Sequence, residues 1–114
     1  MTECLFCKII EKKIPAKIAY EDDKVLAFHD ISPKAPVHIL IIPKKHISAV
    51  NELTDQDGEI IGYLHLIAKK LAKENKIEKS GFRLVINNGP DAGQAVSHIH
   101  LHVLGGRKLQ WPPG

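Results

Sequence analysis

The chain is short of cysteine, of aromatic residues and of long apolar runs. Its two cysteines lie near the same end, so the disulfide framework of a small secreted protein is excluded. No apolar run approaches the roughly 20 residues that are needed to cross a bilayer, which predicts no membrane span. Aromatic residues make up only 5% of the chain, so a surface that binds nucleic acid by base stacking is a minor alternative.

The chain also has little net charge and no long block of like charges. The 16 basic and 13 acidic residues give a net charge of +3 and form no long block, which suits an anionic small molecule better than a nucleic acid. The stretch from Met1 to Ile10 lacks the basic start and small-residue cleavage site of a secretory signal, so we expect a cytoplasmic protein. At 114 residues the chain has room for one core, and we expect a single domain over residues 1–114.

Hydrophobic spacing predicts two helices and five strands. Apolar residues recur at helical spacing in about the first ten residues, before Pro15, and again beyond a cap at Thr54 or Asp55. The second helix has an apolar stripe of Ile60, Leu64, Ile67 and Leu71. The predicted strands cover residues 17–21, 25–29, 37–42, 82–87 and 97–104. Because the strand connections are short, these elements indicate an α+β domain with a mainly antiparallel sheet.

The segment His98-Ile99-His100-Leu101-His102-Val103 has histidine at every second position. On a strand, this period places the three imidazoles on one face and the apolar residues on the other. Three neighbouring imidazoles gain little from burial and repel when charged, so a purely structural role explains them poorly. Binding of one metal ion by all three is disfavoured as well, because the Cα atoms of His98 and His102 lie about 13 Å apart on a strand.

Nucleophilic catalysis on phosphorus is the stronger interpretation of these histidines. Near pH 7, an imidazole with a pKa of about 6.5 is mostly neutral and has a nitrogen free to attack. His100, the middle residue, has a neighbour on each side that can fix its tautomer or donate a proton to phosphate or a leaving group. Gly89 and Gly93 lie upstream and allow backbone N–H groups to approach phosphate oxygens, although such a loop equally suits a plain strand connection.

At these residues the sequence resembles the histidine triad family, whose signature alternates three histidines with apolar residues. The resemblance extends over nearly the whole chain, and the ending is similar to that of the Hint branch. The matching segments outside the triad are Asp30-Ile31-Ser32-Pro33, His38, Ile42-Pro43-Lys44-Lys45-His46, Asn87, Gly93-Gln94, Leu104-Gly105-Gly106-Arg107 and Trp111-Pro112-Pro113-Gly114. The resemblance implies a homodimer in which two five-stranded sheets join and each C-terminal tail reaches toward the partner's active site.

The resemblance also implies a reaction. His100 would attack the α-phosphorus of a purine nucleoside 5'-phosphoramidate or a related nucleoside monophosphate conjugate, release an amine or similar group, and be regenerated by water. The implied catalytic residues are His100, His102, His38 and His98. The implied nucleotide-binding residues are Phe6, Asp30, Ile31, Asn87, Gly93, Gln94, Ala95, His100, His102 and Trp111. Asp30 would accept hydrogen bonds from ribose hydroxyls, and the ligand would be a purine nucleoside monophosphate such as AMP or GMP.

Ala95 departs from the family pattern. Many Hint proteins have serine at this position, two residues beyond the loop glycine, and an alanine side chain cannot hydrogen-bond a leaving group. We therefore expect slower phosphoramidate turnover, or protonation of the leaving group by histidine and solvent.

Cys4 and Cys7 form a C-x-x-C pair that is open to two interpretations. Taken alone, they are two half-buried thiols on an opening helix, since no strand precedes them as thioredoxin-like chemistry requires. The resemblance favours a metal site instead, because some bacterial-type relatives hold zinc with this pair and with residues that match His46 and His98. Such a Cys2His2 set would be tetrahedral and structural, and it would make His98 a ligand rather than an acid.

Other interpretations stay open. His65, beside the apolar stripe of the long helix, and His29, at a strand end, are interpreted as surface residues. Without the family pattern, Asp30 would be a turn residue and Trp111 a surface plug. As alternatives to the hydrolase, the sequence allows a nucleotide-binding regulatory or scaffold protein and a dinucleoside polyphosphate hydrolase.

Overall fold

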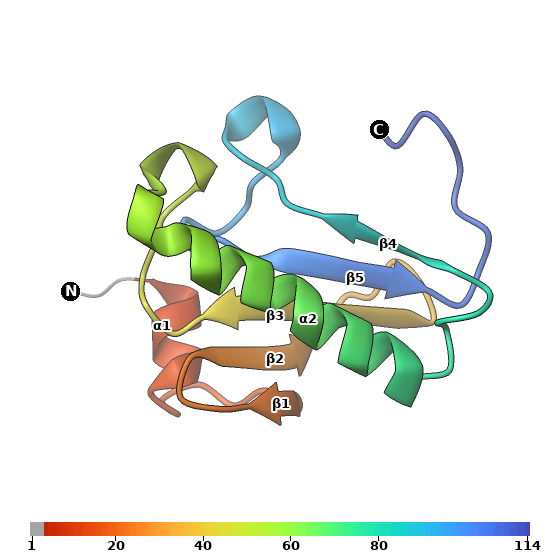
Figure 1. Ribbon diagram of the computed structural model, residues 1–114, viewed down its shortest axis with the longest axis horizontal. Helices are drawn as coiled ribbons and strands as arrows, with labels where there is room; N and C mark the ends of the chain where they lie inside the picture. Colours follow the sequence, from red (N-terminus) through yellow and green to blue (C-terminus); the bar gives the residue numbers. More distant parts are fainter. Residues whose placement is uncertain (1–3) are drawn as a thin grey trace.

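A computed structural model describes residues 4–114 and contains a five-stranded sheet with a helix against each face (Figure 1). The two predicted helices are α1 (Leu5–Ile10) and α2 (Gly58–Glu74), and the strands are β1 (Ile18–Glu21), β2 (Val25–His29), β3 (Val37–Pro43), β4 (Phe82–Val85) and β5 (Leu101–Gly105). The strand order is β1-β2-β3-β5-β4, and every neighbouring pair is antiparallel. The predicted α+β class with a five-stranded antiparallel sheet is therefore confirmed.

The long helix α2 covers one face of the sheet. Thr54, one of the two predicted caps, caps the 3-10 turn η2 (Asp55–Asp57) that runs directly into α2, in a capping box whose Asp57 carboxylate accepts the Thr54 backbone N–H at 2.9 Å. Leu64, Ile67 and Leu71 are buried against the sheet, as the apolar stripe predicts. Within residues 4–114, no helix is long and apolar enough to cross a membrane.

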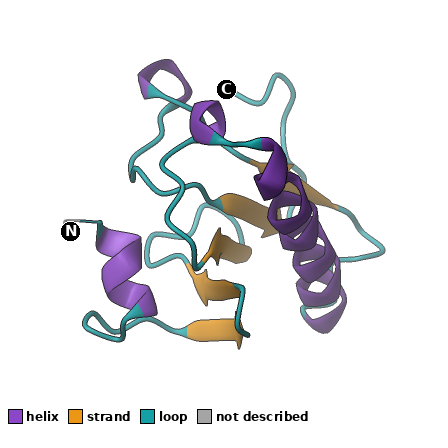
Figure 2. Cartoon of the chain, turned by 60° about the vertical axis from the view of Figure 1, so that its left-hand side comes forward, coloured by secondary structure: helices purple, strands orange, loops and turns teal. Residues whose placement is uncertain are grey.

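The short helix α1 lies on the opposite face of the sheet (Figure 2). Phe6 and Ile9 pack there against Leu26 and Phe28 of β2 and Leu40 of β3. Because side chains alternate along a strand, neighbouring residues of β2 and β3 serve the two faces, and both strands are almost entirely buried. The sheet therefore has a core on each side, and the candidate site lies on the α1 side.

The last strand is shorter than predicted. The sequence predicts a strand from residue 97, but β5 begins only at Leu101. The reason lies in β3, since the antiparallel register would place Ile99 opposite Pro43, which has no N–H to donate. Ile99 instead donates its N–H to the carbonyl oxygen of Ile47 at 2.7 Å. Two of the three histidines therefore precede the strand.

The two edge strands of the sheet, β1 and β4, differ in regularity. β1 has a bulge between Ile18 and Tyr20, where its register against β2 shifts. β4 pairs with β5 without a shift, although it ends at Val85 and not at Asn87 as predicted. One edge of the sheet is thus irregular and the other regular.

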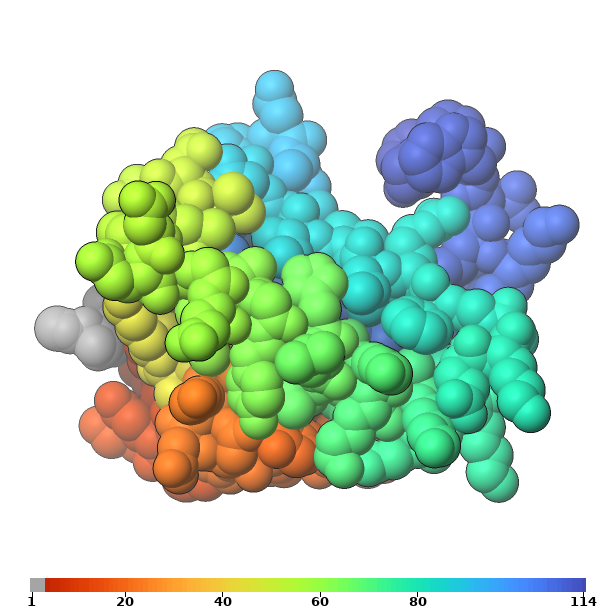
Figure 3. Space-filling view, viewed as in Figure 1, coloured from red at the N-terminus to blue at the C-terminus, as the bar shows by residue number. Residues whose placement is uncertain are grey.

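The C-terminal tail, which comprises residues 106–114 after β5, stands away from the sheet. Figure 3 shows the tail, in blue, projecting beyond the rest of the chain, with a hollow between it and the loop that follows β4. Trp111 is 80% exposed, and its ring centroid lies 6.0 Å from the guanidinium carbon of Arg83 on β4. The tail therefore buries little of its aromatic surface within its own chain.

Candidate active site and metal cluster

A pocket of about 280 Å³ opens on the α1 face of the sheet. Of the residues predicted to bind nucleotide, those that line it are Phe6, Asp30, Ile31, Ala95, His100 and His102. The others, Asn87, Gly93, Gln94 and Trp111, do not line it. The pocket thus combines an apolar wall with two of the triad histidines.

His100 is held in one tautomer by the backbone. Its Nδ1 lies 2.7 Å from the carbonyl oxygen of His98, and a carbonyl only accepts, so Nδ1 carries the proton. In the neutral ring, Nε2 then has the lone pair that a nucleophile needs. The ring is 5% exposed and packs at right angles to Phe6, with 5.1 Å between the ring centroids. Since His100 lines the pocket, Nε2 is the nitrogen available to a ligand.

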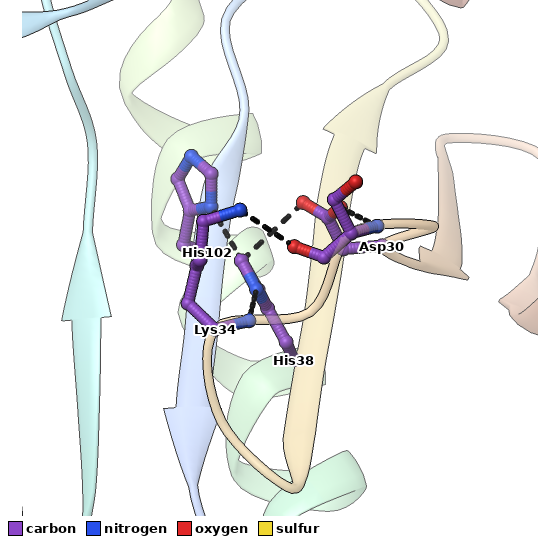
Figure 4. Close-up of polar contacts among 5 residues, drawn as sticks. Asp30, Lys34, His38 and His102 are labelled. Carbon is purple, nitrogen blue, oxygen red and sulfur yellow. Dashed lines mark hydrogen bonds and ion pairs between the residues drawn. The ribbon is translucent and has the colours of Figure 1, made fainter.

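His38 and His102 form a second ordered pair (Figure 4). The backbone N–H of Lys34 donates to His38 Nδ1 at 3.0 Å, so the proton of the neutral His38 ring is on Nε2. That N–H donates to His102 Nδ1, which lies 2.9 Å away, and the proton of His102 is therefore on its own Nε2. The rings of His100 and His102 are 4.9 Å apart between centroids. The pocket therefore holds one ring with an Nε2–H donor next to another with an Nε2 lone pair.

Asp30 joins this group from the loop after β2. One carboxylate oxygen lies 3.5 Å from His38 Nε2, and the other accepts the Ser32 N–H at 2.7 Å. The second contact is the one that an aspartate makes in a turn, so Asp30 also acts as a turn residue. Asp30, His38 and His102 lie close enough to share an ion. However, the 2.9 Å between the two histidine nitrogens is a hydrogen-bond distance, shorter than the about 3.3 Å between ligand nitrogens of a tetrahedral metal. Hydrogen bonding explains this group without an ion.

Burial keeps His38 and His102 neutral. Desolvation lowers the pKa of His38 below its ordinary value, against the opposing effect of Asp30. Desolvation, together with the nearby rings of His100 and His38, lowers the pKa of His102 to about 4. Both rings are therefore uncharged near pH 7, as the tautomer assignments require.

Cys4, Cys7, His46 and His98 come together as the family resemblance implies. Nδ1 of His98 lies 3.4 Å from Cys4 Sγ and 3.6 Å from Cys7 Sγ. Nδ1 of His46 lies 3.4 Å from Cys7 Sγ and 3.2 Å from Nδ1 of His98. A tetrahedral ion with zinc-like bond lengths requires about 3.6 Å between sulfur and nitrogen and about 3.3 Å between two nitrogens. The donor atoms therefore fit a tetrahedral Cys2His2 metal site.

The surroundings of the cluster also fit a metal. His98 donates its Nε2–H to the carbonyl oxygen of Pro43 at 2.8 Å, which leaves the lone pair of Nδ1 facing the cysteines. The Cys7 N–H donates to Cys4 Sγ at 3.3 Å, a contact that stabilises a thiolate. Desolvation and the adjacent Cys4 raise the pKa of Cys7 to about 11, so a cation is needed to bring that thiol into its ligand form. His98 does not line the pocket, which supports a ligand role over an acid role.

The long loop between β4 and β5 contains a tight 3-10 turn, η3 (Pro90–Ala92). Gly89 and Gly93 have φ angles of 85° and 84°, which other residues rarely adopt. The Gln94 side chain is used inside the loop, where its oxygen accepts the Gly89 N–H at 2.9 Å. Its amide donates to the carbonyl oxygens of Ser48 and Val96 at 2.7 and 3.0 Å. The Gln94 backbone N–H also donates within the loop, to the carbonyl oxygen of Gly89 at 3.1 Å, so neither the side-chain amide nor the N–H is available to a ligand while these bonds persist.

Sequence patterns do not single out every residue of the site. His29, interpreted as a surface residue, is half-buried in the pocket wall, and Leu40 lines the same wall. Arg107 donates from Nε and Nη2 to the carbonyl oxygen of Lys34 at 3.1 and 2.8 Å, and so supports the loop that orients His38. The sequence does contain a signal for Arg107, because Arg107 lies in the ending that resembles the family. The sequence contains no such signal for His29.

Comparison with known proteins assigns the family. The family model of the HIT domain matches residues 11–109. An uncharacterized HIT-like protein of Synechocystis is 52% identical over 112 residues, which cover 98% of this chain and 97% of that relative. The chain therefore belongs to the HIT family.

Solved structures agree with this assignment. A HIT family hydrolase from Legionella pneumophila is 52% identical and has a TM-score of 0.97, over 98% of this chain and 100% of the other. A histidine triad protein from Clostridium difficile is 44% identical and has a TM-score of 0.93, over 96% of each chain. A histidine triad nucleotide-binding protein from Candida albicans is 34% identical and has a TM-score of 0.83, over 96% of this chain and 83% of the other.

Proposed function

We propose that this protein is a nucleotide hydrolase that cleaves purine nucleoside 5'-phosphoramidates, or related nucleoside monophosphate conjugates, through a nucleotidyl-histidine intermediate. The observation that carries the proposal is a pair of opposite roles at one pocket, where His100 has an unprotonated Nε2 and His102 a protonated one. A nucleophile needs the first, and a phosphate oxygen needs the second. The relatives from Legionella and Candida, described as a hydrolase and as nucleotide-binding, support the same class.

The proposed reaction has two displacements. His100 Nε2 attacks the α-phosphorus, so that a nitrogen–phosphorus bond forms while the bond to the amine breaks and the amine leaves with a proton. The positive charge on the phosphorylated ring is stabilised by the hydrogen bond from Nδ1 to the carbonyl oxygen of His98. Water then attacks the phosphorus, the bond to His100 breaks, and a nucleoside monophosphate leaves. Because Ala95 offers only a methyl group, the proton for the amine comes from histidine or solvent.

The remainder of the pocket suits a purine nucleoside monophosphate such as AMP or GMP. Phe6 and Ile31 supply apolar surface, and the volume of about 280 Å³ lies near the lower end of ligand pockets. Asp30 offers carboxylate oxygens that accept from ribose hydroxyls. In this proposal, phosphate oxygens accept hydrogen bonds from the Asn87 amide and from the backbone N–H of Ala95, beside the donor of His102. The N–H groups of Gly93 and Gln94 are not used, because they already donate to Pro90 and Gly89 within the loop.

We also propose that the Cys2His2 cluster holds a structural zinc ion, because four donors leave no open position for water or substrate. Protein purified without chelator should contain about one zinc ion per chain, and Cys7→Ala should lower that content. Chelation should also lower the melting temperature, because the ion binds the folded chain. Elemental analysis and thermal denaturation test this, and a zinc-free protein whose stability ignores chelator would contradict it.

The assembly that we propose is a homodimer joined through β4. This strand is a regular sheet edge, whose outer N–H and C=O groups have no neighbouring strand in this sheet. The exposed Trp111 lies beside Arg83 of the same strand, so pairing at β4 would carry the tail toward the pocket of the second chain.

Hydrolysis of a purine nucleoside 5'-phosphoramidate tests the proposed activity. Wild-type protein should release the nucleoside monophosphate and yield a trapped covalent nucleotidyl adduct. His100→Ala should lose both and still bind nucleotide. His65→Ala is the matched control, because His65 is exposed on α2 as predicted, and it should behave as wild type.

The same assay separates the alternatives. Tight nucleotide binding by the wild type, with neither turnover nor adduct, would support a nucleotide-binding regulatory or scaffold protein. Faster cleavage of a bridged dinucleotide than of the phosphoramidate would support a dinucleoside polyphosphate hydrolase.

A further inference from the structure

Helix α1 connects the metal cluster to the pocket. Cys4 and Cys7 lie at its N-terminal end, and Phe6 lies between them in the sequence. The Phe6 ring meets the His100 ring edge-on, with 5.1 Å between the centroids and 89° between the planes. Its centroid also lies 6.0 Å from that of the His98 ring, and Phe6 is only 5% exposed. One buried side chain thus packs against both a cluster ligand and the candidate nucleophile.

His98 makes a second connection between the same two places. Its ring belongs to the cluster through Nδ1, while its backbone carbonyl accepts the His100 Nδ1–H at 2.7 Å. The ring is fixed on its other side by the Pro43 carbonyl oxygen, which lies 2.8 Å from Nε2. A shift of residue 98 therefore moves the acceptor that sets the tautomer of His100.

The two connections carry one inference, which rests on the proposed role of His100 as nucleophile. We propose that Phe6 and the His98 carbonyl are positioning groups for His100, and that an ion bound by the Cys2His2 cluster keeps both in place. Each group acts through the His100 ring and not on the phosphorus. Occupancy of the cluster then determines whether His100 presents an unprotonated Nε2 to the pocket.

The need for an ion follows from the size of α1. A helix of six residues is far below the length at which isolated helices are stable in water, so α1 depends on its packing and on its ends. Without a cation, the sulfur–nitrogen contacts of the cluster span 3.4 to 3.6 Å, and thiols are weak donors. A bound ion joins the four donors directly, and so fixes the start of α1 relative to residue 98.

Nitrogen NMR of the histidine rings tests the proposal, because protonated and unprotonated ring nitrogens have different chemical shifts. The samples are zinc-loaded protein, the same protein stripped with chelator, and stripped protein to which Zn²⁺ has been returned, all at one pH without nucleotide. His100 should be a single Nδ1–H tautomer when loaded, a mixture when stripped, and a single tautomer again when zinc is restored. Unchanged His100 shifts across samples in which the His98 shifts change would overturn the proposal.

Two variants of the zinc-loaded protein decide the question even where stripping unfolds the chain. Phe6→Leu removes the ring that packs on His100, so we expect mixed tautomers and a kcat that is lower by about tenfold or more. Phe6→Tyr keeps the ring and should restore the single tautomer. Leu26→Val is the matched control, because Leu26 is buried in the same core as Phe6 but does not line the pocket. Equal His100 shifts in Phe6→Leu and Leu26→Val would overturn the proposal.

This outcome is distinguishable from failure of the proposed function. A zinc-dependent tautomer of His100 in a protein that does not turn over phosphoramidates supports the positioning role and overturns the hydrolase. Turnover with a tautomer that ignores both zinc and Phe6 supports the hydrolase and overturns the positioning role.

Discussion

At the scale of single residues, the site depends on which nitrogen of each histidine carries the proton. Backbone groups make that choice at two points, through the carbonyl of residue 98 for His100 and the N–H of Lys34 for His38. His102 differs, because the partner that fixes its tautomer is the His38 side chain. His38 is therefore the position at which a substitution changes the protonation pattern of the site.

Replacing His38 tests this dependence. His38→Ala removes the donor to His102 Nδ1, which leaves His102 free to place its proton on either nitrogen, so kcat should fall by about a hundredfold with a smaller change in KM. His38→Gln still donates from its amide and should recover part of the loss. Steady-state kinetics on one phosphoramidate measure both variants, and equal losses in the two would contradict the argument.

The neutral histidines also make stability depend on pH. Desolvation and the nearby imidazoles lower the pKa of His102 from 6.5 to about 4, so between these values the unfolded chain binds a proton that the folded chain does not. This contribution to the free energy of unfolding is present above pH 6.5 and is lost as the pH falls toward 4. Urea denaturation of zinc-loaded protein at several pH values checks this. In His102→Gln, the free energy of unfolding should fall less steeply as the pH is lowered from 6.5 to about 4. An equally steep fall in the variant would count against His102 as the source of this pH dependence.

At the scale of helices and strands, the sequence predicts the elements that local patterns determine better than the features that depend on long-range contacts. The β1–β2 hairpin, β3 and the apolar stripe of α2 lie where spacing and turn chemistry predict them. The predicted start of β5 is wrong, because the observed start depends on Pro43, which lies in a strand that is distant in sequence. The same distinction holds at the site, where the family resemblance implies the Cys2His2 cluster, but no pattern predicts the place of His29 in the pocket wall. The pocket wall brings His29 close to residues distant in sequence, such as Ala95 and His100, and no local pattern records that proximity.

The turn after β5 gives a prediction at this scale. Gly106 has a φ of +94°, and a Cβ there would lie 2.8 Å from the Cβ of Pro36. Gly106→Ala should therefore lower the free energy of unfolding by about 2 kcal/mol. Gly62→Ala on α2 is the contrasting variant, because a Cβ there meets nothing within 4 Å, and it should raise the same quantity by up to about 1 kcal/mol. Urea denaturation measures both, and an unchanged Gly106→Ala would show that the loop of Pro36 moves aside.

At the scale of the whole molecule, the C-terminal tail carries a large exposed side chain, Trp111, that lies outside the pocket of its own chain. Trp111 is 80% exposed and does not line the pocket of its own chain. Under the proposed homodimer, it completes the nucleoside pocket of the other chain. This arrangement would give Trp111 a role in binding that is separate from the proposed role of His100 in chemistry.

Trp111→Ala should raise KM for a purine nucleoside phosphoramidate by about tenfold and leave kcat nearly unchanged, because it removes apolar contact area and no reacting group. Light scattering should give a dimer for both the wild type and the variant. An unchanged KM would contradict the placement of the tail. A monomer across a wide concentration range would contradict the dimer itself.

The bulge in β1 bears on how far pairing between chains can spread. A sheet with two regular open edges can add one chain after another and grow into a ribbon. Here the register shift between Ile18 and Tyr20 disturbs one edge, and Glu21, on the same strand, is paired with Lys12 and Lys44, which adds charge beside it. Growth from that side is disfavoured, so the proposed assembly at β4 should close after two chains and should not grow into a fibre.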